Sequence, residues 1–382
     1  MNNKNATPVV LQVLPEMDHG GVEVGTTEIA SELQKNGIKN FVASAGGRMV
    51  YHLDKIKVKH FTLPLKTKNP IKLYLNSRKL EKIIKENGIN IVHARSRAPA
   101  WSAYWATKRA KVHFVTTFHG TYGLGPWGIK KIYNRVMTYG ERIIAISEHI
   151  KNHILTNYKK VDPAKIRLIH RCVNLNNFSP ETMTSERIIK VITDNHIPED
   201  KKIISLVGRV TRWKGQHLLI EALSKIKSEN TYCLIVGSDQ GRAKYRNELE
   251  EMVRKLGLEH SVQFIGQSFD IPAILAISDV VLSTAIEPEA FGRAAIEGQA
   301  MGKTVLASNI GGSLENMVDG KTGRLFESNN SDSLAEAIDW ALNLNKKDRE
   351  KISAAAIENV KNNFTKQIMC DKTIKVYEEL LK

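Results

Sequence analysis

Short apolar runs alternate with longer amphipathic segments along the first half of the chain. The runs predict strands at residues 9–14, 40–45, 89–94, 113–118 and 142–147. Helical periodicity marks residues 24–37 and 75–88, and each segment ends at a glycine, the residue expected where a helix terminates. Strands that alternate with helices predict a parallel sheet covered on both faces.

The same pattern restarts after a polar, proline-containing segment at 174–187, which is typical of a linker. Further strands are predicted at 202–208, 232–237, 262–266, 279–284 and 303–308, with helices at 215–227 and 243–256 between them. We therefore expect two doubly wound α/β domains, residues 1–180 and 186–365, with a final helical segment, 366–382, that packs back on the first. Ligands of such sheets bind outside the carboxyl ends of the strands, so two domains in tandem predict a cleft between them.

Composition places the chain among globular proteins. Hydrophobic residues make up 42% and charged residues 25% of the 382 positions. The three cysteines, Cys172, Cys233 and Cys370, lie far apart, which favours a reducing cytosol over a disulfide framework. No apolar run approaches the roughly 20 residues that span a bilayer, and the N-terminus reads as a first strand, not a signal peptide. We expect an intracellular protein.

The excess of positive over negative charge is confined to the first half of the chain. Residues 1–185 contain 29 Lys and Arg against 12 Asp and Glu, a net +17, whereas the remainder has 27 against 28. This asymmetry indicates an anionic partner for one domain only, either nucleic acid or an anionic membrane surface.

Several loops that follow predicted strands carry residues suited to phosphates. In "LVGRVTRWKG" (206–215), Gly208 allows a tight exit from the strand, and Arg209 and Lys214 suit a diphosphate unless they are ordinary solvated cations. Gly20 and Gly21 let backbone N–H groups approach a ligand at a helix N-terminus, although glycine pairs often serve only as turns. His119 ends another strand and could donate to a sugar hydroxyl or a phosphate oxygen, or be a satisfied core residue.

The segment "EPEAFGRAAIEG" (287–298) places two carboxylates around a predicted helix start. On one continuous helix, Glu289 and Glu297 would point about 80° apart, but Pro288 and Gly292 indicate that the helix begins only near 291–292. Glu289 then lies in the loop and Glu297 about two turns into the helix. Carboxylates accept hydrogen bonds from paired hydroxyls, so a sugar-bearing ligand could meet both.

Taken together, these blocks resemble the signature of family 4 retaining glycosyltransferases of the GT-B fold. That signature runs E-x7-E, A-x-G-x-P-V-x-A, G-G-x-x-E and G-x-T-G, and "EPEAFGRAAIEGQAMGKTVLASNIGGSLENMVDGKTGRLF" follows it. "GRVTRWKG", "GGVE", "FHGTYG", "AISEHI" and "LIHRCVNLNNFSP" match other blocks in order. Thr304 stands where the family pattern has a proline. The "NGVD" block departs from the pattern at Arg171, Cys172 and Asn174. These departures affect the expected details of the donor pocket and not the class of enzyme.

The resemblance implies roles for individual residues. Arg209 and Lys214 would hold the diphosphate of a nucleotide sugar, helped by the backbone at Gly21, Gly208, Phe291, Gly292 and Arg293. Glu297 would hold the ribose and Glu289 the donor sugar, with His119 near the transferred sugar and Gln267 beside the base. Arg209, Lys214, Glu289 and His119 would form the catalytic set. We expect a retaining, metal-independent reaction without a cofactor, because no DxD-type motif is evident and fixed cations can stabilise the leaving diphosphate.

The first domain would bind the acceptor, at residues including Gly20, Arg95, Arg97 and Tyr122. In "GPWGIKKIYNRVMTYGERI" (125–143), Trp127, Ile132, Tyr133, Val136 and Met137 can form one apolar side with Lys130, Lys131 and Arg135 around it. This pattern is typical of an interfacial helix, although a helix packed on its own sheet would show it too. We expect a lipid-linked or lipopolysaccharide-type acceptor at the inner face of the cytoplasmic membrane.

Three other interpretations remain open. A soluble transferase acting on a polysaccharide or metabolite would show no lipid dependence. An epimerase or hydrolase on the same fold would process the donor without an acceptor. A nucleic-acid-binding module is suggested only by charge and leaves the E-x7-E block unexplained. The sequence leaves UDP, GDP, ADP and dTDP equally open as the nucleotide.

Overall fold

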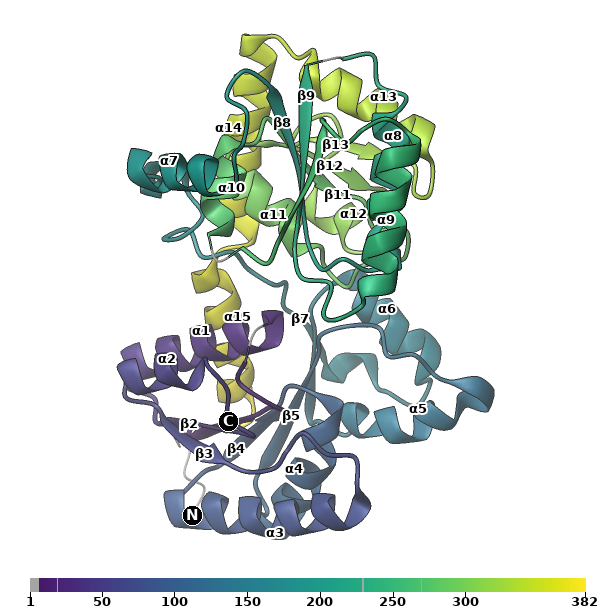
Figure 1. Ribbon diagram of the computed structural model, residues 1–382. Coiled ribbons are helices and arrows are strands. Elements are labelled where there is room, and N and C mark those ends of the chain that lie inside the picture. The colour runs from purple at the N-terminus through teal and green to yellow at the C-terminus, as the bar shows by residue number, and fades with distance from the viewer. Residues whose placement is uncertain (1–6, 19, 229, 269) are drawn as a thin grey trace. The chain divides into compact units, whose positions relative to one another are not determined.

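The computed structural model describes residues 7–18, 20–228, 230–268 and 270–382. Residue contacts divide the chain into two units, Met1–Arg171 with Gln367–Lys382 and Cys172–Lys366. The polar segment 174–187 lies within the second unit, where it includes a 3-10 turn, η4 (Pro180–Thr182), and the start of α7 (Ser185–Asp194). Each unit is built around one parallel sheet (Figure 1).

The first unit contains a seven-stranded sheet in the order β3-β2-β1-β4-β5-β6-β7. Its strands are β1 (Val10–Val13), β2 (Asn40–Ser44), β3 (Lys59–Thr62), β4 (Ile91–Ala94), β5 (His113–Phe118), β6 (Arg142–Ala145) and β7 (Ile166–Leu168). All neighbours pair in parallel. The strand order reverses between β1 and β4, which makes their carboxyl ends the topological switch point of this sheet.

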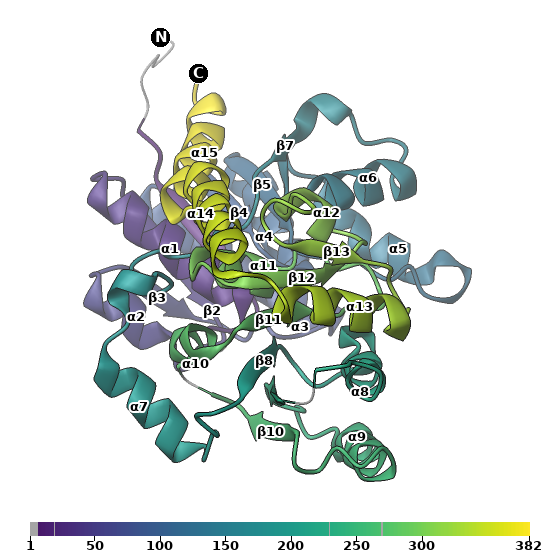
Figure 2. The same cartoon turned by 90° about the horizontal axis from the view of Figure 1, so that it is seen from above.

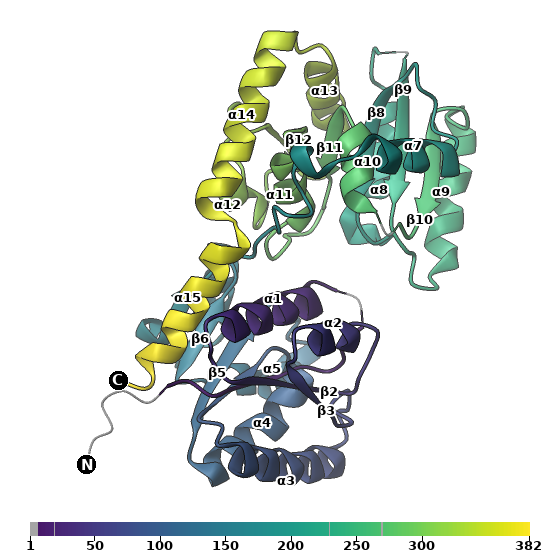
Figure 3. The same ribbon diagram turned by 90° about the vertical axis from the view of Figure 1, so that its left-hand side faces the viewer.

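Helices cover both faces of the first sheet. They are α1 (Gly21–Lys35), α2 (Val50–Lys55), α3 (Pro70–Asn87), α4 (Arg97–Ala110), α5 (Ile129–Asn134), α6 (Glu148–Asn157) and α15 (Lys366–Glu379), with 3-10 turns η1 (Pro126–Gly128), η2 (Arg135–Thr138) and η3 (Pro163–Lys165). Figure 3 shows α1 and α2 on one face and α3 and α4 on the other. Leu14, Ala30, Val42 and Leu53 belong to one buried cluster that joins the first of these layers to the sheet.

The C-terminal helix α15 packs within the first unit. Tyr377 is fully buried, and its hydroxyl lies 2.7 Å from Nδ1 of His93 in β4. Glu379 accepts hydrogen bonds from Arg142 of β6 and Arg167 of β7. The last segment of the chain therefore completes the core of the first unit.

The second unit contains a six-stranded parallel sheet in the order β10-β9-β8-β11-β12-β13. Its strands are β8 (Lys202–Val207), β9 (Thr231–Val236), β10 (Val262–Gly266), β11 (Val280–Ser283), β12 (Thr304–Ser308) and β13 (Arg324–Phe326). Its other helices are α8 (Gln216–Leu223), α9 (Ala243–Lys255), α10 (Ile271–Ile277), α11 (Arg293–Ala300), α12 (Ser313–Asn316), α13 (Ser331–Leu342) and α14 (Lys346–Asn363), with the 3-10 turn η5 (Arg212–Lys214).

Two apolar layers enclose this second sheet. Side chains of α8, α9 and α13 join one buried cluster, represented by Leu219, Leu249 and Ile338. Side chains of α10 and α11 form the opposite layer, represented by Leu275 and Ala295. Figure 2 shows α8 and α9 on one side of β8 and α10 on the other. The order reverses between β8 and β11, so the switch point of this sheet lies at their carboxyl ends.

The segment 125–143 does not form the single helix with one continuous apolar side that its sequence suggests. It is broken into η1, α5 and η2, and the side chain of Trp127 lies outside the described part of the structure. Val136 and Met137 are fully buried, whereas Ile129 and Ile132 are each 67% exposed. The prediction of one apolar side is wrong because the break at Arg135 turns the later residues into the core and leaves the earlier ones on the surface.

Candidate functional site

The loops after β8 and β11 meet at the switch point of the second sheet. The amide of Ile286 donates to the carbonyl oxygen of Trp213 at 2.9 Å, and the Thr284 hydroxyl donates to the carbonyl oxygen of Lys214 at 2.8 Å. Gly215 has a φ of +72°, and a Cβ there would lie 2.0 Å from the Thr284 carbonyl oxygen. Glycine is therefore required at this close crossing, which fixes Lys214 beside the second loop.

Two further glycines, Gly292 and Gly312, shape the loop that carries Glu289. The amide of Gly312 donates to the Glu289 carbonyl oxygen at 2.9 Å, and a Cβ on Gly312 would meet the Phe291 backbone at 2.3 Å. Gly292, with a φ of +80°, caps the N-terminus of α11, and Nδ2 of Asn316 donates to its carbonyl oxygen at 3.2 Å. Glu289 thus lies in the loop before the helix and Glu297 inside it.

Both carboxylates of this loop and helix form ion pairs with cations of the same site. The Lys214 Nζ lies 2.5 Å from Oε1 of Glu289, with side chains 16% and 11% exposed. The Arg293 Nη2 lies 2.6 Å from Oε1 of Glu297, with side chains 34% and 10% exposed. Lys214 and Glu289 come from loops 75 residues apart in sequence. The structure brings together these four predicted donor-site residues.

Arg209 differs from the other cations of the site. It is exposed, and it forms no ion pair among the residues that the structure describes. Its guanidinium lies 5.9 Å from the centre of the Trp213 ring, and its carbonyl oxygen accepts from Nε2 of Gln216 at 2.9 Å. The guanidinium is therefore available to an anion at the carboxyl end of β8.

Gly208 and Gln267 complete the predicted set in the second unit. A Cβ at Gly237 would lie 1.9 Å from the Gly208 carbonyl oxygen, so the ends of β8 and β9 approach closely. Gln267 follows β10 and is exposed. Its position beside a base is a prediction that no contact within the described residues tests.

The switch point of the first sheet contains Gly20, Gly21 and Arg95. Gly20 precedes α1 and is exposed, and the Gly21 carbonyl oxygen accepts a hydrogen bond from Nη2 of Arg171. Arg95 is only 2% exposed, and its Nη1 donates to Oε1 of Gln12 at 3.2 Å. Burial, followed by the charge of Arg171, lowers the pKa of Arg95 to about 10.

His119 follows β5 and lines a cavity of about 10 Å³ in the first unit, together with His93, Arg95 and Arg171. Its Nε2 is buried and has no hydrogen-bond partner within the described residues. Burial, and then the charges of Arg95 and Arg171, lower the pKa of His119 well below its ordinary value. His119 is therefore neutral near pH 7, so it can donate or accept a hydrogen bond but supplies no cation.

Arg97 and Tyr122 also lie together in the first unit. The Arg97 guanidinium stacks 4.2 Å from the centre of the Tyr122 ring, and its Nη1 donates to Oδ1 of Asn134 at 3.1 Å. Tyr122 is buried, which raises the pKa of its hydroxyl to about 12. The acceptor roles of Gly20, Arg95, Arg97 and Tyr122 stay predictions.

Sequence reasoning did not identify the residues that hold this site in shape. Thr284, Gln216 and Asn316 each use a side chain to bind a loop backbone, and a single polar residue in a loop or short helix gives no sequence signal. The glycine pair at 311–312 belongs to the G-G-x-x-E motif, but the motif does not indicate its contact with Glu289. Within the described ranges, no group of three His, Cys, Asp or Glu side chains is placed to hold a metal ion.

Known proteins with similar sequences and folds include glycosyltransferases. The family model described as "Glycosyl transferases group 1" matches residues 188–359, and the model "Glycosyltransferase Family 4" matches residues 19–177. A solved glycosyltransferase from Rickettsia africae is 41% identical, with a TM-score of 0.91, over 99% of this chain and 100% of that one. HepE from Anabaena, solved with UDP and glucose, has a TM-score of 0.85 at 21% identity, over 98% and 100% of the two chains.

A curated relative extends the comparison to a named activity. The D-inositol 3-phosphate glycosyltransferase of Corynebacterium diphtheriae is 25% identical over 65% of this chain and 58% of its own length. Two parallel α/β sheets, a cationic switch point and these matches define a glycosyltransferase of the GT-B fold. The chain belongs to glycosyltransferase family 4.

Proposed function

We propose that the protein transfers a sugar from a nucleoside-diphosphate sugar to an acceptor, with retention of anomeric configuration and without a divalent metal. The observation that carries this proposal is the position of Arg209 and Lys214 at the β8–β11 switch point, beside Glu289 and Glu297. Ligands of doubly wound sheets bind at this point, and guanidinium and ammonium groups suit a diphosphate.

The chemistry follows from where charge develops. When the bond between the anomeric carbon and the diphosphate breaks, its electron pair stays on the phosphate oxygen and the sugar becomes cationic. Arg209 and Lys214 would stabilise the leaving diphosphate, and the N–H groups at Phe291–Arg293 would assist them. Glu297 would accept hydrogen bonds from the ribose and Glu289 from the transferred sugar, with neutral His119 near that sugar. The acceptor hydroxyl would attack on the face that the diphosphate leaves, and its proton would pass to the departing phosphate oxygen.

Among the possible donors, UDP-sugars deserve the first trial. HepE, which shares this fold, was solved with UDP and with glucose, whereas nothing in the second unit of this chain excludes GDP, ADP or dTDP. We propose no cofactor beyond the nucleotide sugar. Gly21, Gly208 and Gln267 would complete the donor contacts.

The acceptor is proposed to be a lipid-linked or lipopolysaccharide-type glycan, at the inner face of the cytoplasmic membrane. In α5, Ile129 and Ile132 are exposed beside Lys130 and Lys131, a combination that suits an anionic lipid surface. Each Lys or Arg close to such a surface contributes about 1 kcal/mol. No helix in the described part of the chain is long and apolar enough to cross a bilayer.

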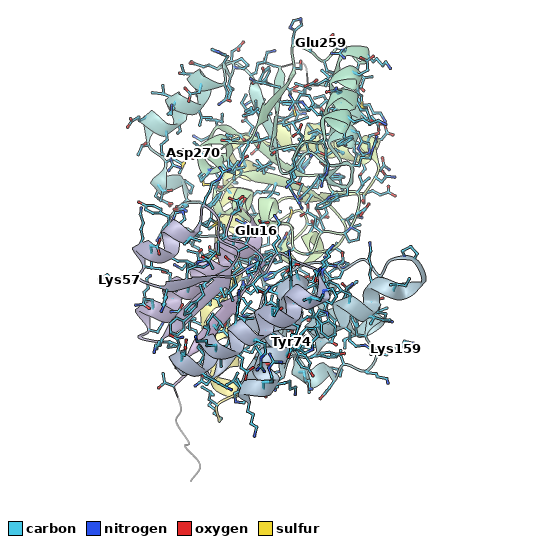
Figure 4. All side chains as sticks on the ribbon, turned by 60° about the horizontal axis from the view of Figure 1, so that its bottom comes forward. Glu16, Lys57, Tyr74, Lys159, Glu259 and Asp270 are labelled. Atoms are coloured by element: carbon cyan, nitrogen blue, oxygen red, sulfur yellow. The ribbon has the colours of Figure 1, made fainter. Side chains whose placement is uncertain are left out.

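A second apolar and basic group supports the same proposal. At the start of α3, Ile71, Tyr74 and Leu75 are exposed around Lys72. Figure 4 labels Tyr74 on the ribbon of this helix. Isolated exposed apolar side chains are common, but three within one turn and a half beside a lysine form a small patch.

A soluble acceptor is the alternative, and one relative supports it. The Corynebacterium diphtheriae relative is named for D-inositol 3-phosphate, a small phosphorylated molecule. Arg95 and Arg97 at the carboxyl end of β4 could serve such an acceptor. An epimerase on the same fold would convert the donor with no acceptor present.

Three measurements test the proposed function. A thermal-shift screen with UDP-, GDP-, ADP- and dTDP-sugars should give stabilisation by one base, and turnover of that donor should require a membrane extract or a purified glycan. Absence of any shift would contradict donor binding, and donor conversion without acceptor would favour the epimerase. Co-sedimentation with anionic and neutral vesicles at low salt tests the membrane, because equal partition would remove that part of the proposal.

A further inference from the structure

Both carboxylates of the second unit's site are already paired with cations before any ligand arrives. Glu289 has Lys214 as its only ion-pair partner among the described residues, at 2.5 Å and with both side chains largely buried. Arg209 is the cation that remains available. An incoming diphosphate therefore meets one available cation and one that is already engaged.

Lys214 cannot bind the Glu289 carboxylate and the diphosphate equally well at the same time. An ammonium group has three N–H donors on one charge, and a diphosphate brings several acceptor oxygens and more than one negative charge. Drawing Lys214 toward the diphosphate would leave the Glu289 carboxylate, 11% exposed, without its cation. A buried carboxylate that loses its partner is strongly destabilised unless other donors replace it.

We propose that Glu289 competes with the diphosphate for Lys214, and that this competition makes the site prefer an intact nucleotide sugar over the nucleoside diphosphate product. The proposal rests on the proposed function. The hydroxyl groups of an intact donor sugar replace Lys214 as hydrogen-bond donors to Glu289. The product supplies no such hydroxyl groups, so Glu289 retains Lys214 and the product is held less tightly.

The other carboxylate provides an internal contrast. Glu297 pairs with Arg293, whose side chain is 34% exposed and so retains access to water. The ribose that Glu297 would hold is present in both the intact donor and the product. Loss of Glu297 should therefore weaken both ligands alike, whereas loss of Glu289 should affect them in opposite directions.

The test is calorimetric titration of the full chain with UDP and UDP-glucose, or with the corresponding pair for whichever base the donor screen selects. In Glu289→Gln, which keeps the side-chain volume, the affinity for UDP should rise about tenfold, the effect of 1.4 kcal/mol at 25 °C. The ratio of UDP-glucose to UDP affinity should fall toward one. Glu297→Gln should lower both affinities and leave their ratio near the wild-type value.

A double-mutant cycle with Lys214→Met separates competition from simple repulsion between Glu289 and phosphate. Competition predicts that Glu289→Gln gives a much smaller gain in UDP affinity when Lys214 is absent. Equal gains in the two backgrounds would show repulsion alone and would overturn the proposal. Glu289→Ala serves as a second variant if Glu289→Gln fails to fold, as judged by circular dichroism.

Two outcomes distinguish failure of the competition for Lys214 from failure of the proposed transferase function. If wild type binds UDP and UDP-glucose, but Glu289→Gln binds UDP with unchanged or lower affinity, the competition is wrong and the transferase proposal stands. If wild type binds none of the four nucleoside diphosphates or their sugars, both proposals are wrong.

Discussion

The two switch points of this protein share a topology and differ in electrostatics. At the second, exposed Arg209 stands beside two ion pairs, Lys214–Glu289 and Arg293–Glu297. At the first, Arg95 is buried, has an uncharged hydrogen-bond partner, Gln12, and lies near other basic side chains. One edge therefore carries two acid–base pairs beside an available cation, and the other carries buried basic groups.

This difference is the one expected if, as proposed, the two units perform different tasks. A site that binds and releases a highly charged leaving group benefits from carboxylates that take its cations back. In the first unit, burial lowers the pKa of His93 and His119, so we expect the stability of this unit to depend on pH.

Removal of both diphosphate-binding cations should have the largest effect. In Arg209→Ala combined with Lys214→Met, transfer should fall by at least about 1000-fold, because removal of one preorganised donor to a developing anion already costs about 100- to 1000-fold. Initial rates with saturating acceptor measure the effect. Arg212→Ala is the matched control, since Arg212 lies in the same loop, is exposed and pairs with Glu248. A double variant as active as this control would contradict the assignment of the second switch point.

The surface of the first unit should show a smaller effect. Ile129→Ser with Ile132→Ser should lower partition onto anionic vesicles about tenfold, since each isoleucine side chain buried in lipid contributes on the order of 1.5–3 kcal/mol and only part of each would be buried. Co-sedimentation measures it. Ile189→Ser in the second unit removes a similarly exposed isoleucine, 61% exposed, and should leave partition unchanged. If both variants lose the same fraction of binding, the asymmetry between the units has no part in lipid binding.

The smallest effect concerns the dependence of stability on pH. Burial lowers the pKa of His93 and His119 well below 6.5, so below that pH the unfolded chain binds protons that the native first unit does not. The free energy of unfolding should therefore decrease as the pH falls through about 6.5. Above that pH both histidines are neutral in the folded and the unfolded chain, so they should contribute little to any change in stability. Urea unfolding midpoints between pH 5 and 8 measure this slope.

A histidine variant identifies the source of that slope. His93→Gln should flatten the pH dependence, because the unfolded variant binds one proton fewer in this range. An unchanged slope in His93→Gln would show that His93 is protonated in the native state and would contradict its burial as a neutral group.

Central strands were predictable, as was the edge strand β10, whereas the other three edge strands were not. The apolar runs at 9–14 and 202–208 correspond to β1 and β8, which are covered on both faces, so nearly every side chain must be apolar. The strands β3, β7 and β13 lie at or next to sheet edges, are short and carry partly exposed side chains, and gave no apolar run. Helix α4 was missed because Pro99 interrupts the pattern, although proline is tolerated in the first turn of a helix.

The sequence by itself determined the two parallel α/β sheets, the family and the start of α11 beside Gly292, because apolar periodicity and glycine placement are local properties of the chain. Only the tertiary structure decided that Lys214 pairs with Glu289, that Arg95 is buried and that Ile129 is exposed. The physical reason is separation: charge pairing and burial depend on loops far apart in sequence that the sheets bring together, and no local pattern encodes the partner.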